Sequence, residues 1–237
     1  MRLMNAWINP LAFLEVDGPP APGAPAQPEP QTVLEFICPP GTASDVPTLV
    51  ERYKSIAQEP VPLAIVPAEQ RILDKLVWPL RHAKASYMVG NYLAVIALAG
   101  MVAEMVALLR WETAELSLNG RPMTADDERA LFGATFEKLG HDRRLHVLFA
   151  YGLLDAAAKG RFETIKQTRR GYLHLWSQDH DALPGDATKS YYAAVALVAT
   201  TIGQDFRDGK IVINQPLVKY LERHGVYTPV DEPAPEV

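Results

Sequence analysis

Residues 93–109, LAVIALAGMVAEMVALL, are the most apolar stretch of the chain and decide its fold class. As a helix this stretch is near the shortest length that spans a bilayer. It carries Glu104 in its second half, and a carboxylate is costly in the hydrocarbon core of a membrane. We therefore expect residues 86–112 to form a buried helix of a globular protein, and we expect no membrane association.

Helical periodicity continues on both sides of this stretch. Capping signals, such as Thr124 with Asp127 three residues later, and turn signals, such as Asn119-Gly120, divide it into elements. Gly140 and Gly160 are expected to end helices, and Pro184-Gly185 is expected in a loop over 180–186. The predicted helices cover about 45–58, 67–84 with an interruption at Pro79, 86–112, 124–139, 142–158, 162–177, 187–206 and 215–223. The predicted fold is an all-α, up-and-down helical bundle.

The two ends of the chain have a different composition. Residues 18–30, GPPAPGAPAQPEP, contain six prolines and predict an extended linker. Thr32 to Cys38 alternates weakly and predicts a short strand. The expected organisation is an N-terminal segment 1–17, a Pro/Ala-rich linker 18–30, a short strand and loop 31–42, a helical domain 43–226 and a disordered tail 227–237.

Composition and missing motifs narrow the function classes. Cys38 is the single cysteine, so no intramolecular disulfide can form, which fits a reducing compartment and predicts a cytoplasmic protein. The chain contains no Walker A loop, no GxGxxG, no HExxH and no cysteine cluster with zinc spacing. His141 and His146, five residues apart, fall on different faces of a helix and make a poor joint metal site. We expect neither a cofactor nor a metal.

Charge is distributed unevenly along the chain. The whole chain carries a net charge of −5, yet residues 137–170 hold eight basic and four acidic residues. A basic hairpin of helices in an acidic protein can bind an anion locally. The predicted substrate-binding residues are Arg143, Arg144, Lys166 and Arg170. The alternative is that these side chains form ordinary solvated helix faces.

Residues 168–174, TRRGYLH, carry the strongest chemical signal in that basic stretch. Arginine can neutralise a phosphate oxygen, and histidine exchanges a proton near neutral pH. Arg169 and His174 therefore suffice in principle for metal-free RNA cleavage, in which the ribose 2′-hydroxyl attacks its own phosphate. On an ideal helix these two residues lie roughly 140° apart. Arg170 shares a face with His174, unless Gly171 kinks the helix or a second subunit completes the site.

The order of these elements resembles the HEPN superfamily, and more closely the HEPN-like domains called DUF4145. The resemblance covers about residues 88–208. It rests on GMVAEMVALL at 100–109, on FEKLGHDRRLHVLFAYGLLDAAAKGRFETIKQTRRGYLH at 136–174, and on the closing helix at 187–206. That order is similar to the family's plan, in which a helix ending in Gly-Leu-Leu precedes the helix with Arg-x4-His.

The resemblance implies a fold and an activity. Arg169 and His174 would be the catalytic pair of a metal-independent endoribonuclease of a defence or toxin–antitoxin system. Glu104 would be a buried support or an arginine partner; its alternative is a partly exposed charge at a helix edge. Family members dimerise across the motif helices, so a homodimer is expected, with RNA and an antitoxin or complex subunit as partners. Arg170 stands where active members usually carry Asn, Asp or His. The alternative function is therefore a noncatalytic dimerisation or partner-binding module.

Overall fold

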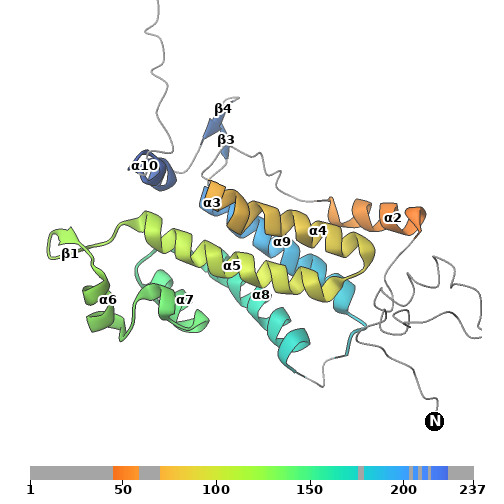
Figure 1. The fold of residues 1–237 in the computed structure, drawn as a ribbon, viewed down its shortest axis with the longest axis horizontal. Helices are drawn as coiled ribbons and strands as arrows, with labels where there is room; N and C mark the ends of the chain where they lie inside the picture. Colours follow the sequence, from red (N-terminus) through yellow and green to blue (C-terminus); the bar gives the residue numbers. More distant parts are fainter. Residues whose placement is uncertain are drawn as a thin grey trace, which may run out of the picture.

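The computed structural model describes residues 45–58, 70–175, 179–202, 205–207, 210–212 and 215–223. These residues form an all-α bundle, as the sequence predicts, with two very short antiparallel hairpins (Figure 1). The predicted segments 1–17, 18–30 and 31–42, the strand at 32–38 and the tail at 227–237 lie outside the described residues. Helix α2 (Val46–Ile56) begins where predicted, because the Asp45 carboxylate accepts a hydrogen bond from the Thr48 amide.

Helix α5 (Tyr92–Ala114) is the central element of the bundle and contains the stretch 93–109. It packs most extensively against α9 (Leu183–Ile202) and α4 (Trp78–Val89), and it also contacts α8 (Ala156–His174) and α7 (His141–Ala150). By length and composition α5 could cross a membrane, but half of its most apolar window is buried within the bundle. Neighbours on several sides explain why this helix is apolar around most of its circumference.

The N-terminal boundary of α5 differs from the prediction. Gly90 adopts a left-handed conformation (φ 86°) and ends α4, so residues 86–89 belong to α4 and not to α5. The Asn91 side chain then caps α5 by accepting a hydrogen bond from the Ala94 amide. The boundary between these two helices therefore lies at residues 90–91, and the predicted boundary between 84 and 86 is wrong.

Pro79 lies at the start of a helix, where the sequence suggested an interruption. Helix α3 (Gln70–Ile72) runs into a π-helical turn (Leu73–Val77), and α4 begins directly afterwards. Proline is tolerated in the first turn of a helix because the first amide groups have no intrahelical acceptor. The chain therefore stays helical from Gln70 to Val89, with no loop at Pro79.

An excursion from the bundle follows α5. The strands β1 (Ser117–Leu118) and β2 (Arg121–Pro122) pair around the predicted Asn119-Gly120 turn. Thr124 and Asp127 form the predicted capping box at the start of α6 (Ala125–Phe132). The predicted end of this helix at Gly140 is wrong: left-handed Gly133 ends α6, and a short 3-10 helix, η3 (Phe136–Lys138), follows.

This excursion is anchored to α5 by one tryptophan. The Trp111 indole donates to the Glu128 carboxylate of α6 at 2.7 Å, and the other Glu128 oxygen accepts from the Phe136 amide at 2.8 Å. The Trp111 ring also stacks on Phe136, with ring centroids 4.3 Å apart. One partly buried cluster therefore holds α6 and η3 against the second half of α5.

Helices α7 and α8 divide the basic stretch differently from the prediction. Gly140 precedes α7, left-handed Gly152 lies in the turn after it, and Asp155 caps α8 through the Ala158 amide. Gly160 therefore lies inside α8 and does not end a helix. Helix α8 continues without interruption through Gly171 to His174, so the expected end at residue 177 is also corrected.

The last helix of the bundle, α9, starts earlier and ends earlier than predicted. Pro184-Gly185 occupies its first turn and not a loop, which again reflects the tolerance of a helix N-terminus for proline. Beyond Ile202, residues 205–206 belong to β3 (Asp205–Arg207), which pairs with β4 (Lys210–Val212). Helix α10 (Gln215–Arg223) follows at the predicted position.

Candidate functional site

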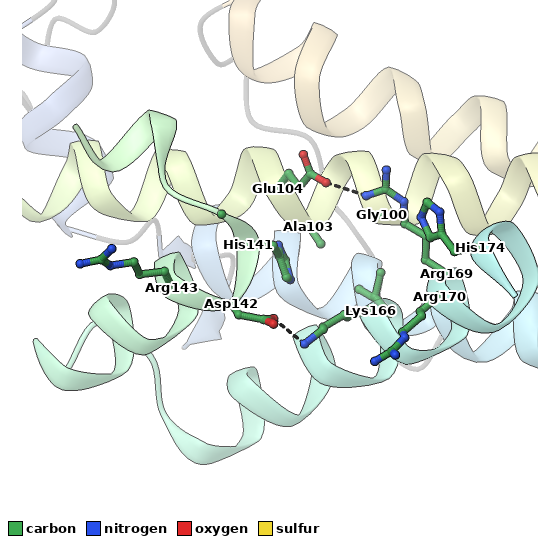
Figure 2. A pocket seen from close by; sticks show the side chains of 12 residues that line it. Gly100, Ala103, Glu104, His141, Asp142, Arg143, Lys166, Arg169, Arg170 and His174 are labelled. Atoms are coloured by element: carbon green, nitrogen blue, oxygen red, sulfur yellow. Dashed lines mark hydrogen bonds and ion pairs between the residues drawn. The ribbon is translucent and has the colours of Figure 1, made fainter. Parts of the chain in front are cut away.

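A cavity of about 590 Å³ lies where α5, the start of α7 and the second half of α8 meet (Figure 2). Most of the residues predicted for the site line it, although they come from three separate helices. Its walls are formed by Gly100, Ala103, Glu104, Gly140, His141, Asp142, Arg143, Ile165, Lys166, Arg169, Arg170 and His174. The fold therefore brings Arg169, His174, Glu104, Lys166, Arg143 and Arg170 to one place.

Arg169 spans the gap between α8 and α5. Its guanidinium donates a hydrogen bond of 2.6 Å to the Glu104 carboxylate, and both side chains are about one-third exposed (Figure 2). Its Nε is buried without a hydrogen-bond partner among the described residues. The ion pair fixes the direction of the arginine while leaving part of its hydrogen-bonding capacity unused.

Gly100 makes this position of Arg169 possible. A Cβ atom at residue 100 would lie 2.8 Å from Cδ of Arg169, closer than carbon atoms normally approach. Gly100 and Glu104 are one helical turn apart on α5 and therefore contact the same arginine. Gly100 leaves space for the stem of Arg169, and Glu104 accepts its hydrogen bond. Glycine costs helix stability in the middle of α5, and the space it gives to Arg169 accounts for its presence there.

The N-terminus of α7 forms a second wall of the cavity. Gly140, at the N-cap position, has no side chain with which to cap the first turn, and it lines the cavity with the next three residues. The first amide groups of a helix lack intrahelical acceptors and carry the positive end of the helix dipole. This wall therefore offers amide donors that favour an anion.

Lys166 and Asp142 connect the α7 wall to α8. Their side chains form an ion pair (Figure 2), and hydrogen bonding to Lys166 lowers the pKa of the Asp142 carboxyl below its ordinary value. Both side chains are more than one-third exposed, so the pair contributes little to folding stability. The pair matters for the charge of the cavity, because Asp142 already neutralises the charge of Lys166 there.

Two arginines of the cavity have no such counterion. Arg143 and Arg170 are exposed, and within the described part of the chain neither forms an ion pair. Four cationic side chains thus line the cavity against two carboxylates, and both carboxylates are already paired. The excess positive charge makes the cavity suitable for an anion.

The angular prediction for α8 has a mixed outcome. Arg169, Arg170 and His174 all line the cavity although α8 is not kinked at Gly171. Figure 2 shows Arg169 and His174 directed to the same side, toward α5, while Arg170 is directed away from it. Arg170 is therefore not the same-side neighbour of His174 that ideal helix geometry indicated. Long side chains at the end of a helix can cover a wide angle around its axis.

Arg144 is the one predicted anion contact that the structure does not bring to this cavity. Its guanidinium donates to the backbone carbonyl of Glu137 at 2.5 Å, and Arg144 is absent from the cavity walls. It ties the start of α7 to the preceding 3-10 helix. Adjacent side chains of a helix point about 100° apart, so Arg144 is directed away from the cavity that Arg143 lines.

His141 is a cavity residue that sequence reasoning missed. The sequence indicates only that His141 and His146 make a poor joint metal site, whereas the structure places His141, without His146, at the cavity from the first position of α7. Burial lowers the pKa of His141 below its ordinary value, partly opposed by the charges of Glu104 and Asp142. The available signal was its place directly after Gly140, which becomes meaningful only once α7 is known to start there.

The cavity offers an anion site more readily than a metal site. Among the described residues no group of three or more His, Cys, Asp or Glu side chains is arranged to hold a metal ion.

Comparisons of the chain with protein-family models, with curated proteins and with solved structures find no match.

Proposed function

We propose that this chain is a HEPN-like, metal-independent endoribonuclease that binds an RNA phosphate in the cavity between α5, α7 and α8. One observation carries the proposal: arginines, a lysine and histidines from two different helices line one cavity that has more cationic than anionic groups. The uncapped N-terminus of α7 adds amide donors on the same wall. These features match the needs of a phosphodiester anion.

The chemistry requires few groups. The ribose 2′-hydroxyl attacks the adjacent phosphorus, and negative charge grows on the non-bridging oxygens. Arg169 stabilises that charge, His174 moves a proton, and Arg143, Arg170 and Lys166 hold the flanking backbone. DNA lacks the 2′-hydroxyl, so this route spares it. The proposed setting is a cytoplasmic homodimer in a defence or toxin–antitoxin system, with an antitoxin or complex subunit as protein partner.

The test is cleavage of labelled RNA by purified protein in EDTA, with DNA of the same sequence as the negative substrate. Arg169→Ala and His174→Ala should each reduce cleavage at least 100-fold. Arg129→Ala and His146→Ala are matched controls, because both residues are exposed, on α6 and α7, and neither lines the cavity. Full cleavage in both the Arg169 and the His174 variants would refute the assignment.

A second candidate function is a noncatalytic HEPN-like module, and the Arg169–Glu104 ion pair favours it. In that case Arg169 connects α8 to α5 as a structural element. Arg169→Ala and Glu104→Ala should then each lower the free energy of unfolding by about 0.5–1 kcal/mol, and the double variant should lose little more. Denaturant titrations measure this coupling, and unchanged stability in both single variants would exclude the structural role.

A further inference from the structure

His141 is placed in the cavity in a way that packing alone does not explain. Its side chain lies between the Glu104 region of α5 and Lys166 of α8 (Figure 2), and its ring faces Phe162 with centroids 6.2 Å apart. Nδ1 is buried and has no hydrogen-bond partner among the described residues. Buried polar atoms are normally hydrogen-bonded, so an unpaired one beside a cavity points to a ligand or a functional role.

The surroundings of His141 favour the neutral form of its imidazole. Burial is the main cause of its lowered pKa, and Lys166 of α8 and Arg144 of its own helix act in the same direction. Glu104 of α5 and Asp142 of α7 act in the opposite direction, each with less effect than burial but more than either cation. A neutral imidazole can accept a proton at neutral pH, which is what a general base requires.

His146, on the same helix, shows what a histidine without such a role looks like. It is exposed, it does not line the cavity, and its Nδ1 lies 2.9 Å from the Asp142 carbonyl oxygen. The two histidines thus share a helix and a sequence neighbourhood but differ in burial, hydrogen bonding and access to the cavity. His146 is therefore a matched control for His141.

We propose that His141 is a catalytic residue of this cavity, the base that takes the proton of the attacking ribose 2′-hydroxyl. The inference rests on the proposed ribonuclease function and adds a second histidine to it. The 2′-oxygen forms a bond to phosphorus as its proton passes to His141. The bond from phosphorus to the 5′-oxygen breaks as that oxygen receives a proton from His174.

The products of this step balance. One strand ends in a 2′,3′-cyclic phosphate and the other in a 5′-hydroxyl. His141 leaves the step protonated and His174 leaves it neutral, so exchange of one proton with water at each ring restores the starting state. The growing charge on the phosphate is met by Arg169 and by the first amides of α7, where His141 itself is located.

The first experiment compares cleavage of RNA in EDTA by the wild-type chain, His141→Gln and His146→Gln. His141→Gln should reduce the rate constant for cleavage about 100-fold or more, while His146→Gln stays within about 2-fold of wild type. Binding of a fully 2′-O-methylated RNA, which cannot be cleaved, should stay within about 3-fold in both variants. His141→Gln cleaving within about 3-fold of wild type would overturn the proposal.

A second substrate separates the base from the acid. RNA with a bridging 5′-sulfur in place of the 5′-oxygen has a leaving group that needs no proton. It should restore most of the activity of His174→Gln and little of the activity of His141→Gln. Equal restoration of activity in both variants would show that His141 is not the base. If a substitution only damaged the fold, its loss of activity would be the same for the 5′-oxygen and the 5′-sulfur substrate.

Added imidazole provides the remaining check on folding. His141→Ala leaves space in the cavity, and free imidazole should raise its cleavage rate at least 10-fold without affecting His174→Ala in the 5′-sulfur substrate. Absence of rescue in a variant with the wild-type melting temperature would count against the role of His141. A wild-type chain that cleaves no RNA overturns the nuclease itself, whereas normal cleavage by His141→Gln overturns the inference alone.

Discussion

At the scale of single residues, the site is organised by one ion pair that can be read in two ways. Glu104 neutralises Arg169, but it also orients that arginine across the cavity. The resemblance implied that Glu104 is a buried support or an arginine partner; the contact with Arg169 is present, and the carboxylate is about one-third exposed. Sequence alone could not choose between Arg169 and Arg170 as the partner, because the choice depends on the angle at which α8 crosses α5.

Glu104→Gln should strengthen binding of 2′-O-methylated RNA. The substitution removes a negative charge from the cavity and releases the Arg169 guanidinium for a phosphate. The slope of log affinity against log salt should steepen by about 0.7, the value for one more cation on single-stranded nucleic acid. Fluorescence anisotropy over a salt series measures it.

Glu112→Gln is the control for this change, since Glu112 lies on the same helix but pairs with Arg71 outside the cavity. The same gain in both variants would mean that overall charge, not the cavity, determines binding.

At the scale of helices, several boundaries that were predicted from glycine and proline are wrong. Gly133 ends α6 and Gly160 lies within α8, although both follow helical patterns. The two glycines differ in backbone conformation: Gly133 is left-handed, with φ 77°, and Gly160 is not. The local sequence does not determine this difference. Pro79 and Pro184 lie in the first turns of helices. Proline has no amide hydrogen, which disrupts the interior of a helix but is tolerated in its first turn. Local signals with their own hydrogen bonds, such as Asp45 and the Thr124–Asp127 box, were predicted correctly.

Two glycines of different helices should respond differently to alanine. A Cβ at Gly160 meets no atom within 4 Å, so Gly160→Ala should raise the free energy of unfolding by about 0.5–1 kcal/mol. Gly100→Ala gains the same helix propensity but forces the stem of Arg169 to move. It should therefore show a smaller gain or a loss of stability, together with weaker RNA binding. Denaturant titrations compare the pair, and equal gains would show that Arg169 moves freely.

The start of α6 should be sensitive to acid. Hydrogen bonds from Arg121 and then Thr124 hold the pKa of Asp127 well below its ordinary value. Because the folded-state pKa is lower than that of the unfolded chain, this stabilisation is complete above about pH 4 and declines as the pH falls further. Asp127→Asn should melt below wild type at pH 7, and the difference should shrink toward pH 2.

Melting curves followed by circular dichroism test this pH dependence. Asp126→Asn is the neighbouring control, because the Asp126 carboxylate is highly exposed and forms a surface pair with Arg129. A difference between wild type and Asp127→Asn that is the same at both pH values would contradict the prediction.

At the scale of the whole molecule, the proposed dimer has a direct test. Light scattering after size exclusion should give twice the 26.2 kDa mass of one chain. Mixing Arg169→Ala with His174→Ala subunits should restore part of the cleavage if each site uses groups of both subunits. A monomer at micromolar concentration would contradict the dimer, and a dimer without restored activity would place each pair within one subunit.

The central position of α5 also has a consequence for synthesis of the chain. Its main partner α9 begins only at Leu183, after the hairpin, α6, α7 and α8 have been made. At ordinary rates of about 5–20 residues per second, the ribosome needs several seconds to cover that distance. During this interval the most apolar helix of the protein has only α4 and the segments just completed to cover it. The apolar surface of α5 that α9 covers therefore stays exposed on the nascent chain until α9 emerges.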